Sequence, residues 1–269
     1  GIFMACKDAN QTKVIPITTL PPEPAQADKQ APSAPLRLLF GVDSSRNSAA
    51  VLQNNLSLFD WVSRNKLYPN FWGRNINGPD PLTSAEISFL HSKGCKIAPV
   101  FLSSDPGESY EQGMLLAKKA ALAAFTLHIP ENTALFWEAA SSASAEFFKG
   151  YAQGLLTEGY TPGFKADTDA HNSFDREFSR GAQTEPELFR RCLLWAISPS
   201  LKEYDRVTTT HRIHPDLWSP FAPSGSKRRD IALWQYGRNC HPIEDDAGVE
   251  TVFHLNLIKD ERIILDKMF

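Results

Sequence analysis

The sequence predicts an α/β fold, an irregular (β/α)8 barrel of the TIM type that forms a single domain. Short apolar runs alternate with helical stripes through the first two thirds of the chain, a pattern that favours parallel strands joined by right-handed crossovers. Two of the runs end in a carboxylate, at Asp43 and Glu138, and the C-terminal ends of barrel strands are where catalytic groups collect. The 269 residues also fit one barrel, which commonly takes roughly 250 residues.

The first 36 residues are expected to lie outside this domain. Residues 7–35 contain Pro16, Pro21, Pro22, Pro24, Pro32 and Pro35 without an apolar period, which is typical of a semi-rigid linker. Cys6 follows Ile2-Phe-Met-Ala5, which resembles the end of a bacterial lipoprotein signal segment. An arbitrary start of the sequence is the alternative. The domains are therefore residues 1–36, a leader and Pro-rich linker, and residues 37–269, the barrel.

The expected strands are short runs rich in apolar and β-branched residues and bounded by turn residues. They cover residues 36–43, 68–76, 96–102, 133–138, 159–164, 192–197, 206–213, 230–236 and 251–257. The crossovers in the last third are too short to hold full helices, so the barrel should be irregular there.

The expected helices lie between these strands. Residues 47–66 carry an apolar stripe, and Thr83-Ser-Ala-Glu86 is a capping box for a helix that Gly94 ends. An Ala/Leu-rich helix follows residue 109 and runs to about His128. Ser141 or Ser142 should cap the next one, which ends at Gly159, and Thr184-Glu-Pro-Glu187 predicts another start.

Composition excludes several classes of function. The formal net charge is −3, and Lys227-Arg228-Arg229 is the one short basic cluster, so we expect no nucleic-acid partner. No run approaches the roughly 20 apolar residues that span a bilayer. Cys6, Cys95, Cys192 and Cys240 are scattered and form no zinc-ligand spacing; Cys95 and Cys192 should be core thiols. We expect no cofactor and no metal, and a monomer.

Several motifs occur in a characteristic order. Gly41-Val-Asp43, Gly73-Arg74, Glu138, Trp234-Gln-Tyr236 and His254-Leu-Asn256 follow one another along the chain. From about Leu38 to about Leu257 the sequence resembles the glycoside hydrolase-like domains of unknown function of the DUF1906 type, which are related to the family 25 lysozymes. No single motif is specific; their order and spacing carry the resemblance. It implies an eight-stranded β/α barrel that acts on or binds glycans at its C-terminal mouth, with bacterial peptidoglycan as the best-known substrate of the lysozyme branch.

The chain departs from the lysozyme pattern at two places. The lysozymes have Asp two residues before the catalytic Glu, where this chain has Phe136, and their late Val-Asp-Leu-Asn is here Phe253-His-Leu-Asn256. A carboxylate at the mouth is thus replaced by an imidazole. These departures put muramidase activity in doubt.

Cleavage of a glycosidic bond needs an acid and a second carboxylate, or the acetamido group of the substrate. Glu138 is the candidate acid, because Phe136 and Trp137 could give it an apolar setting that favours its protonated form. Asp43 would stay ionised as base or electrostatic stabiliser. A carboxyl separation of about 5 Å would indicate retaining chemistry, and one well beyond about 6.5 Å inverting chemistry. The alternative for Glu138 is a structural salt bridge at a strand end.

The remaining candidates are substrate-binding residues. Arg74 could bind a substrate carboxylate, and Trp234 and Tyr236 could stack on sugar rings. Asp167 and Asp169 could add a third carboxylate or bind a cation through oxygen ligands, although their spacing lacks a complete calcium-loop pattern. The resemblance adds His254 and Asn256 at the mouth. For each the plainer alternative is structural: a salt bridge for Arg74, core packing for the rings, a solvated loop for the two acids and a hydrogen-bonded residue for His254.

The sequence therefore predicts an exported, glycoside hydrolase-like protein of the cell envelope, tethered through Cys6, whose partner is a glycan such as peptidoglycan. A catalytically inactive glycan-binding or envelope-scaffolding module is the alternative. A toxin or effector with a Pro-rich delivery linker is a third interpretation.

Overall fold

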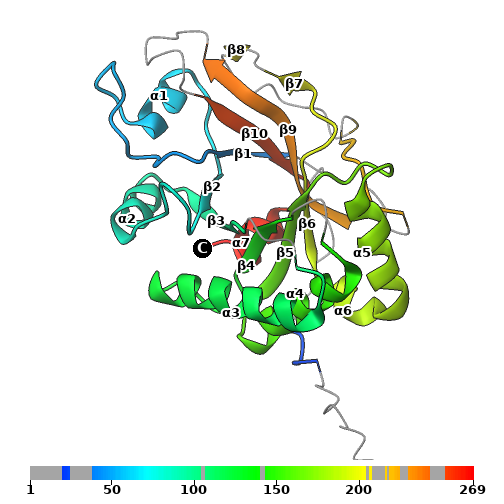
Figure 1. Cartoon of the computed structure of the whole chain (residues 1–269). Helices are drawn as coiled ribbons and strands as arrows, with labels where there is room; N and C mark the ends of the chain where they lie inside the picture. The colour runs from blue at the N-terminus through cyan, green and yellow to red at the C-terminus, as the bar shows by residue number, and fades with distance from the viewer. Residues whose placement is uncertain are drawn as a thin grey trace, which may run out of the picture.

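The computed structural model describes residues 20–24, 38–103, 107–139, 143–203, 206–207, 216, 218–224, 230–242 and 252–269. Eight strands form a closed barrel in the order β10-β1-β2-β3-β4-β5-β6-β9, and a pairing of β10 with β9 closes the ring (Figure 1). These strands are β1 Leu39–Asp43, β2 Phe71–Asn75, β3 Lys96–Phe101, β4 Ala134–Glu138, β5 Thr161–Ala166, β6 Leu193–Ala196, β9 Ile231–Pro242 and β10 Phe253–Ile258. The expected irregular β/α barrel is confirmed.

One strand breaks the parallel order. The neighbouring pairs from β1 to β6, and β6 with β9, are parallel, whereas β10 runs antiparallel to both β1 and β9. The C-terminal half of β9 extends beyond the barrel and pairs with the short strands β7 Lys202–Glu203 and β8 Arg206–Val207. The chain can reverse from β9 into β10 because an antiparallel neighbour needs no helical crossover.

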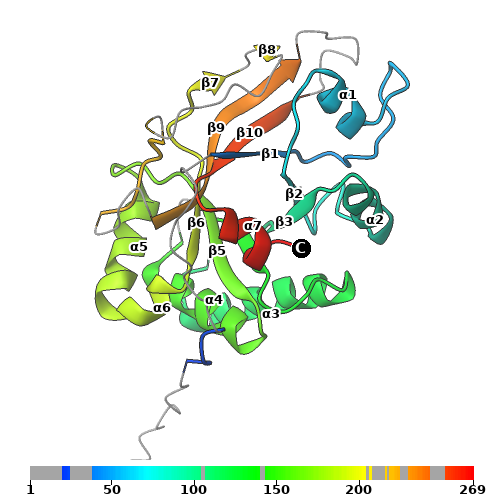
Figure 2. The same cartoon turned by 180° about the vertical axis from the view of Figure 1, so that it is seen from behind.

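The helices lie outside this ring, except for the last one. In Figures 1 and 2, α3 to α6 cover one side of the barrel, while α1 and α2 lie near β1 and β2. Their bounds are α1 Leu58–Arg64, α2 Ser84–Ser92, α3 Tyr110–Thr126, α4 Ala145–Thr157, α5 Ser173–Thr184, α6 Pro186–Arg190 and α7 Glu261–Lys267.

The two ends of the barrel differ. The C-terminal ends of β1 to β6 form the end that we call the mouth. At the opposite end, the base, Phe269 exchanges backbone hydrogen bonds with Ile97 at the start of β3. Ile264 of α7 and Met268 belong to the apolar cluster that fills the barrel interior. The sequence predicted no helix after the strand expected over residues 251–257, whereas the chain there forms α7, which closes the base.

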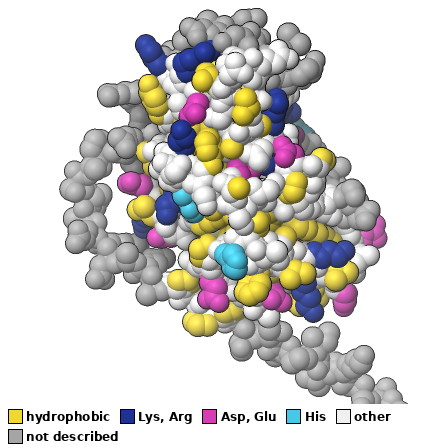
Figure 3. All heavy atoms as spheres, turned by 90° about the vertical axis from the view of Figure 1, so that its left-hand side faces the viewer, with side chains coloured by type: hydrophobic (Ala, Val, Ile, Leu, Met, Phe, Trp, Pro, Cys, Tyr) yellow, Lys and Arg dark blue, Asp and Glu magenta, His cyan; other side chains and the backbone are white. Residues whose placement is uncertain are grey.

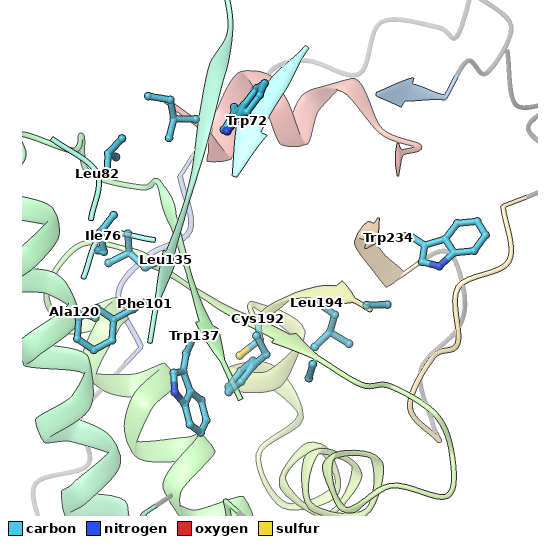
Figure 4. Close-up of a cluster of buried hydrophobic side chains, with 14 of the residues drawn as sticks. Trp72, Ile76, Leu82, Phe101, Ala120, Leu135, Trp137, Cys192, Leu194 and Trp234 are labelled. Atoms are coloured by element: carbon cyan, nitrogen blue, oxygen red, sulfur yellow. The ribbon is translucent and has the colours of Figure 1, made fainter. Parts of the chain in front are cut away.

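Apolar side chains form two layers, one inside the ring and one between the ring and the helices. The interior is packed with large side chains, among them Phe71, Phe136 and Trp195. On the outer face, Leu135 and Trp137 of β4 lie in the cluster with Phe101 and Ala120, as Figure 4 shows. Alternate residues of a strand thus serve opposite layers, as the pleat requires.

Several predicted helix boundaries are wrong, and competing hydrogen bonds explain them. The stripe over residues 47–66 forms helix only from Leu58, capped by Ser57, because Asn47 and Ser48 donate their amides to Asp80 and Glu86 instead. The helix after Glu138 is capped by Ser144. The cap expected at Ser141 or Ser142 is therefore wrong, although these two residues themselves lie outside the described part of the chain.

The capping box predicted at Thr184 is also wrong, although the helix expected there does form as α6, which begins at Pro186 with Glu185 as its N-cap and no side-chain cap hydrogen bond. Thr184 ends α5, a helix that the sequence analysis missed, and its hydroxyl donates to carbonyls of that helix. In α2, Thr83 caps as expected, but the carboxylate of Glu86 binds Arg74 and Ser48 and does not complete the capping box.

Some predictions fall outside the described residues. They concern Cys6 and most of the linker, Lys227-Arg228-Arg229, and residues 208–213 of the strand expected over 206–213. Within the described part, Cys95, Cys192 and Cys240 are buried and form no disulfide, and the first two are the core thiols that the sequence predicted. No helix of that part is long and apolar enough to cross a membrane.

The face shown in Figure 3 mixes side chains of all classes. On the face shown in Figure 3, Lys and Arg side chains alternate with Asp and Glu, and hydrophobic side chains lie among them. Large hydrophobic side chains that are more than half exposed include Leu122 and Phe125 of α3. This face therefore presents no patch of a single charge.

Candidate active site

Five polar side chains from five strands face the mouth of the barrel: Asp43 of β1, Glu138 of β4, Lys165 of β5, Gln235 of β9 and Asn256 of β10. Hydrogen bonds join four of them directly. Glu138 shares the inward face of β4 with Phe136, two residues earlier, which lies in the barrel interior. The two carboxylates that the sequence singles out therefore lie at one end of the barrel.

Asp43 is the centre of this polar layer. Its Oδ2 accepts a hydrogen bond from Lys165 Nζ at 2.9 Å, and its Oδ1 accepts from Asn256 Nδ2 at 2.6 Å and from Gln235 Nε2 at 3.1 Å. Burial by itself raises the pKa of Asp43, but the charges of Lys165 and His254 and the Asn256 hydrogen bond outweigh it and lower the pKa to about 2. Asp43 is therefore ionised at any physiological pH.

Lys165 reaches across the mouth from β5 to Asp43. The two side chains retain only 9% and 7% of their exposed surface, and the ammonium lies 4.7 Å from the centre of the Trp195 ring. A buried ammonium is costly unless it is paired, and here a carboxylate and an aromatic face both compensate it. In the β4–β5 register, Lys165 is also the neighbour of Glu138.

A further hydrogen bond, below Asp43, fixes the side chain of Asn256. Trp195 Nε1 donates to Asn256 Oδ1 at 2.9 Å, which leaves the amide nitrogen of Asn256 to donate to Asp43. Gly73 makes room for this arrangement, because a Cβ there would lie 2.7 Å from Asp43 Cβ and 2.7 Å from the Trp195 ring. Together these contacts fix the orientation of the Asp43 carboxylate.

Glu138 occupies a different setting. Its side chain is exposed, and the apolar enclosure expected from Phe136 and Trp137 is absent. Phe136 packs against Trp195 inside the barrel, while Trp137 points to the outer layer against Phe147. The structure thus places a water-accessible carboxylate on the rim of the mouth and a buried one below it.

His254 joins the site through the antiparallel strand. It is the register partner of Asp43 on β10, and its Nδ1 accepts a hydrogen bond from the Asn239 amide at 3.1 Å, which assigns the proton of the neutral ring to Nε2. Burial lowers the pKa of His254; the carboxylates of Asp43 and Glu138 act against this, and the cations Lys165 and Arg238 act with it. The imidazole is therefore neutral at pH 7.

Arg74 does not face the mouth. Its guanidinium is fully buried and binds both carboxylate oxygens of Glu86, at 2.7 and 3.0 Å, and the carbonyls of Ser44 and Asp80. A side chain without exposed surface cannot contact a substrate. Arg74 instead holds the loop that follows Asp43, so the structure supports the salt-bridge alternative.

The aromatic pair also lies elsewhere. The rings of Trp234 and Tyr236 point the same way, 6.1 Å apart, but toward the outer layer, where Trp234 packs on Trp218 and is fully buried. The pleat turns Gln235, the residue between them, into the mouth. Sugar stacking on these two rings is therefore incompatible with this structure.

Asp167 and Asp169 lie in the loop after β5, beyond Lys165. Asp167 accepts hydrogen bonds from the Ser198 hydroxyl and the Asp169 amide, and Asp169 accepts from the His171 amide. These bonds shape the loop. Among the described residues, no three acidic, histidine or cysteine side chains gather as a metal site would require.

Sequence reasoning missed Lys165, Gln235 and Trp195. The strand expected over residues 159–164 stopped just before Lys165, which in the structure continues the inward alternation of Thr161 and Gly163 in β5. Gln235 alternates with two aromatic residues, and a polar side chain between two apolar ones on a strand indicates that it faces the other way. That pattern could have identified Gln235 as a residue of the mouth. The residues around Trp195 give no comparable signal.

Comparison with known proteins places the fold. No family model and no curated protein sequence matches the chain. In structure the chain is similar to an uncharacterized protein of B. stearothermophilus, with a TM-score of 0.69 and 26% identity over 86% of this chain and 100% of that one.

Two weaker structural likenesses involve named enzymes. The modular autolysin LytC from Streptococcus pneumoniae matches with a TM-score of 0.48 and 9% identity over 82% of this chain and 46% of that chain. A bacterial lysozyme from Streptomyces coelicolor matches with a TM-score of 0.48 and 12% identity, over 84% and 95%. At these scores neither likeness bears on the site of this chain. The shared architecture with the B. stearothermophilus protein is what the comparisons establish.

Proposed function

We propose that this protein acts on a cell-envelope glycan, with peptidoglycan as the first candidate, by acid-base hydrolysis of a glycosidic bond with Glu138 and Asp43. The observation that carries the proposal is the pair of carboxylates in unlike settings at one barrel mouth. Asp43 is buried and held ionised by its partners, and Glu138 is exposed on the rim. Two carboxyl groups with different environments are what such chemistry requires.

The two groups would have different tasks. A glycan bound at the mouth would meet Glu138 on the rim, which would donate a proton to the leaving oxygen and, once deprotonated, accept a proton from the water that adds to the sugar. Both oxygens of Asp43 already accept hydrogen bonds, so this carboxylate is not free to activate water. Of the two roles expected for it, electrostatic stabilisation of the cationic sugar centre fits better than that of a base. His254, the register partner of Asp43 on β10, and Asn256, which binds it, would complete the mouth.

The direct test replaces Glu138 by Gln and measures the release of reducing ends from purified peptidoglycan. Loss of a general acid should slow this release by about 100-fold or more. Glu158→Gln, which changes an exposed Glu at the end of α4, is the matched control and should act like the natural protein. Unchanged release by Glu138→Gln would remove Glu138 from the chemistry.

A glycan-binding or envelope-scaffolding module without turnover is the second candidate, and two observations favour it. Lys165 neutralises Asp43 at 2.9 Å, which weakens the field that Asp43 exerts on a cationic centre. Phe136, at the place of an expected Asp, is sealed in the barrel interior. Retention of the protein on insoluble peptidoglycan without release of reducing ends would support this module, and turnover would dismiss it.

We also propose that the protein is exported and tethered through Cys6, as a monomer whose barrel begins near residue 37. The residues around Cys6 support the tether. Cys6→Ser should release the protein from the membrane fraction of cells that carry the full-length precursor. If the natural protein is itself recovered free of membranes, the tether is wrong.

A further inference from the structure

The base of the barrel carries a groove that the glycan proposal does not use. It is a cavity of about 760 Å3, which we call the base groove. Its walls include Asn132, Thr161 at the start of β5, Arg190, Arg191 and Lys267 of α7. These positions belong to the end of the barrel that α7 closes, so the base groove lies opposite the mouth.

A segment of the chain itself forms one wall of this groove. Leu20–Pro24 reads Leu-Pro-Pro-Glu-Pro, and Pro21 to Pro24 line the cavity. Leu20 packs against the main apolar cluster. Figures 1 and 2 both show the segment beneath α4, apart from the rest of the described chain. A segment far away in sequence is thus held by the base of the barrel.

Two neighbouring arginines hold this segment at separate points. Arg191 Nη1 donates to the carbonyl oxygen of Pro21, and Arg190 Nη2 donates to Glu23 Oε1 at 2.6 Å. The first contact recognises the backbone of the segment, and the second recognises an acidic side chain. Leu20 adds an apolar anchor, so three kinds of contact act within four residues.

The chemistry of the segment suits such a groove. Proline fixes φ, so an extended Pro-rich peptide loses little conformational entropy when it binds. Its carbonyl groups stay free to accept hydrogen bonds, because no internal bonds use them. Arginine supplies donors for both a carbonyl and a carboxylate. The ion pair with Glu23 is half-exposed, so it should add little to the affinity and should mainly favour peptides that carry an acidic residue at this position.

We propose that the base groove is a binding site for an extended, Pro-rich, acidic peptide, and that Leu20–Pro24 is its resident ligand. The site does not depend on the glycan proposal, because the two sites use different residues at opposite ends of the barrel.

The test removes the contacts of Leu20–Pro24 by substitution and then adds the same segment as a separate peptide. In the full-length chain, Leu20→Gly, Pro21→Ser, Pro22→Gly, Glu23→Ser and Pro24→Gly are combined. A fluorescent peptide with the sequence of residues 19–25 is then titrated against this emptied chain and against the natural chain. The emptied chain should bind the peptide at least about 10-fold more tightly, since the tethered segment competes at an effective concentration of about a millimolar.

Matched variants then test the two arginines. In the emptied chain, Arg190→Ala with Arg191→Ala should weaken peptide binding by about 5-fold or more, and a peptide with Gln in place of Glu should bind less tightly and with less dependence on salt. Arg176→Ala with Arg180→Ala, which removes two exposed arginines of α5, should leave binding unchanged. The proposal would be overturned if the emptied chain does not bind the peptide at millimolar concentration. It would also be overturned if both double arginine variants weaken peptide binding equally.

A second measurement serves if the emptied chain does not fold. In a Cys6→Ser background, Leu20→Cys reports docking by the rate at which a neutral reagent modifies its thiol. Arg190→Ala with Arg191→Ala should raise this rate by about 5-fold or more, because the undocked population grows. If the double arginine variant leaves the modification rate of the thiol unchanged, the two arginines do not hold the segment in solution, and the proposal is wrong.

Discussion

Lys165 donates a hydrogen bond to Asp43 across the barrel mouth at 2.9 Å, and the two side chains are nearly buried together. The pair shapes the electrostatics of the mouth, because the Lys165 ammonium helps to keep the pKa of Asp43 low and the Asp43 carboxylate compensates the burial of the ammonium. Each side chain therefore stabilises the other in its buried position.

Lys165→Met should destabilise the fold, because methionine keeps much of the volume and leaves the Asp43 carboxylate buried without its cation. Breaking a buried pair costs about 3 to 5 kcal/mol, measured as the free energy of unfolding in urea at pH 7. Lys149→Met breaks a more exposed pair with Glu146 and should cost less than about 1 kcal/mol. Equal costs for the two variants would show that the buried pair is not special. Lys165→Met combined with Asp43→Asn should recover part of the loss, since no lone charge remains.

Asp43 should make the stability of the protein depend on acid. Its pKa in the folded protein is lowered from 3.8 to about 2, so its contribution is complete above the unfolded value and is lost as pH falls from about 4 toward 2. That contribution amounts to about 2 kcal/mol. The difference in unfolding free energy between the natural protein and Asp43→Asn should therefore shrink over this range. A difference that stays constant from pH 6 to pH 2 would mean that Asp43 has no lowered pKa.

His254 should act in the same direction at higher pH. Burial lowers its folded pKa below the usual 6.5, so its contribution is present above the unfolded value and is lost as pH falls below it. His254→Gln, which cannot be protonated, should show a flatter stability profile between pH 7 and pH 5. An NMR titration of the imidazole checks the cause directly. A folded pKa above 6.5 would show that Asp43 and Glu138 outweigh burial.

The sequence predicted the barrel because apolar runs and helical stripes depend on local periodicity, which short segments reveal. It also predicted that Asp43 and Glu138 would share one end, since parallel strands place their C-terminal ends together. It could not reveal that β10 runs antiparallel, which brings His254 beside Asp43 and Asn256 beside Gln235. Strand direction follows from the connection and not from the residues of the strand.

The partners of the site depend on register, which no short segment contains. Lys165 and Asp43 are 122 residues apart in sequence, and only the assembled ring brings them together. Trp234 and Tyr236 were assigned to the mouth because aromatic rings suit sugars, yet the same alternation sends them to the core and Gln235 to the site. Arg74 was similarly separated from Glu86 in the sequence analysis, because Glu86 was assigned to a helix cap.

Arg74→Met should reveal whether this arginine supports the fold or binds a ligand. Its guanidinium and the Glu86 carboxylate have no exposed surface, so removing one partner leaves a buried, uncompensated charge and should cost about 3 to 5 kcal/mol in the free energy of unfolding. Arg74→Lys should recover only part of it, because an ammonium cannot form the fork that binds both oxygens of Glu86. Arg74→Met with Glu86→Leu should be more stable than Arg74→Met alone, since the lone charge is gone. A variant that unfolds like the natural protein but loses peptidoglycan binding would instead assign Arg74 to the ligand.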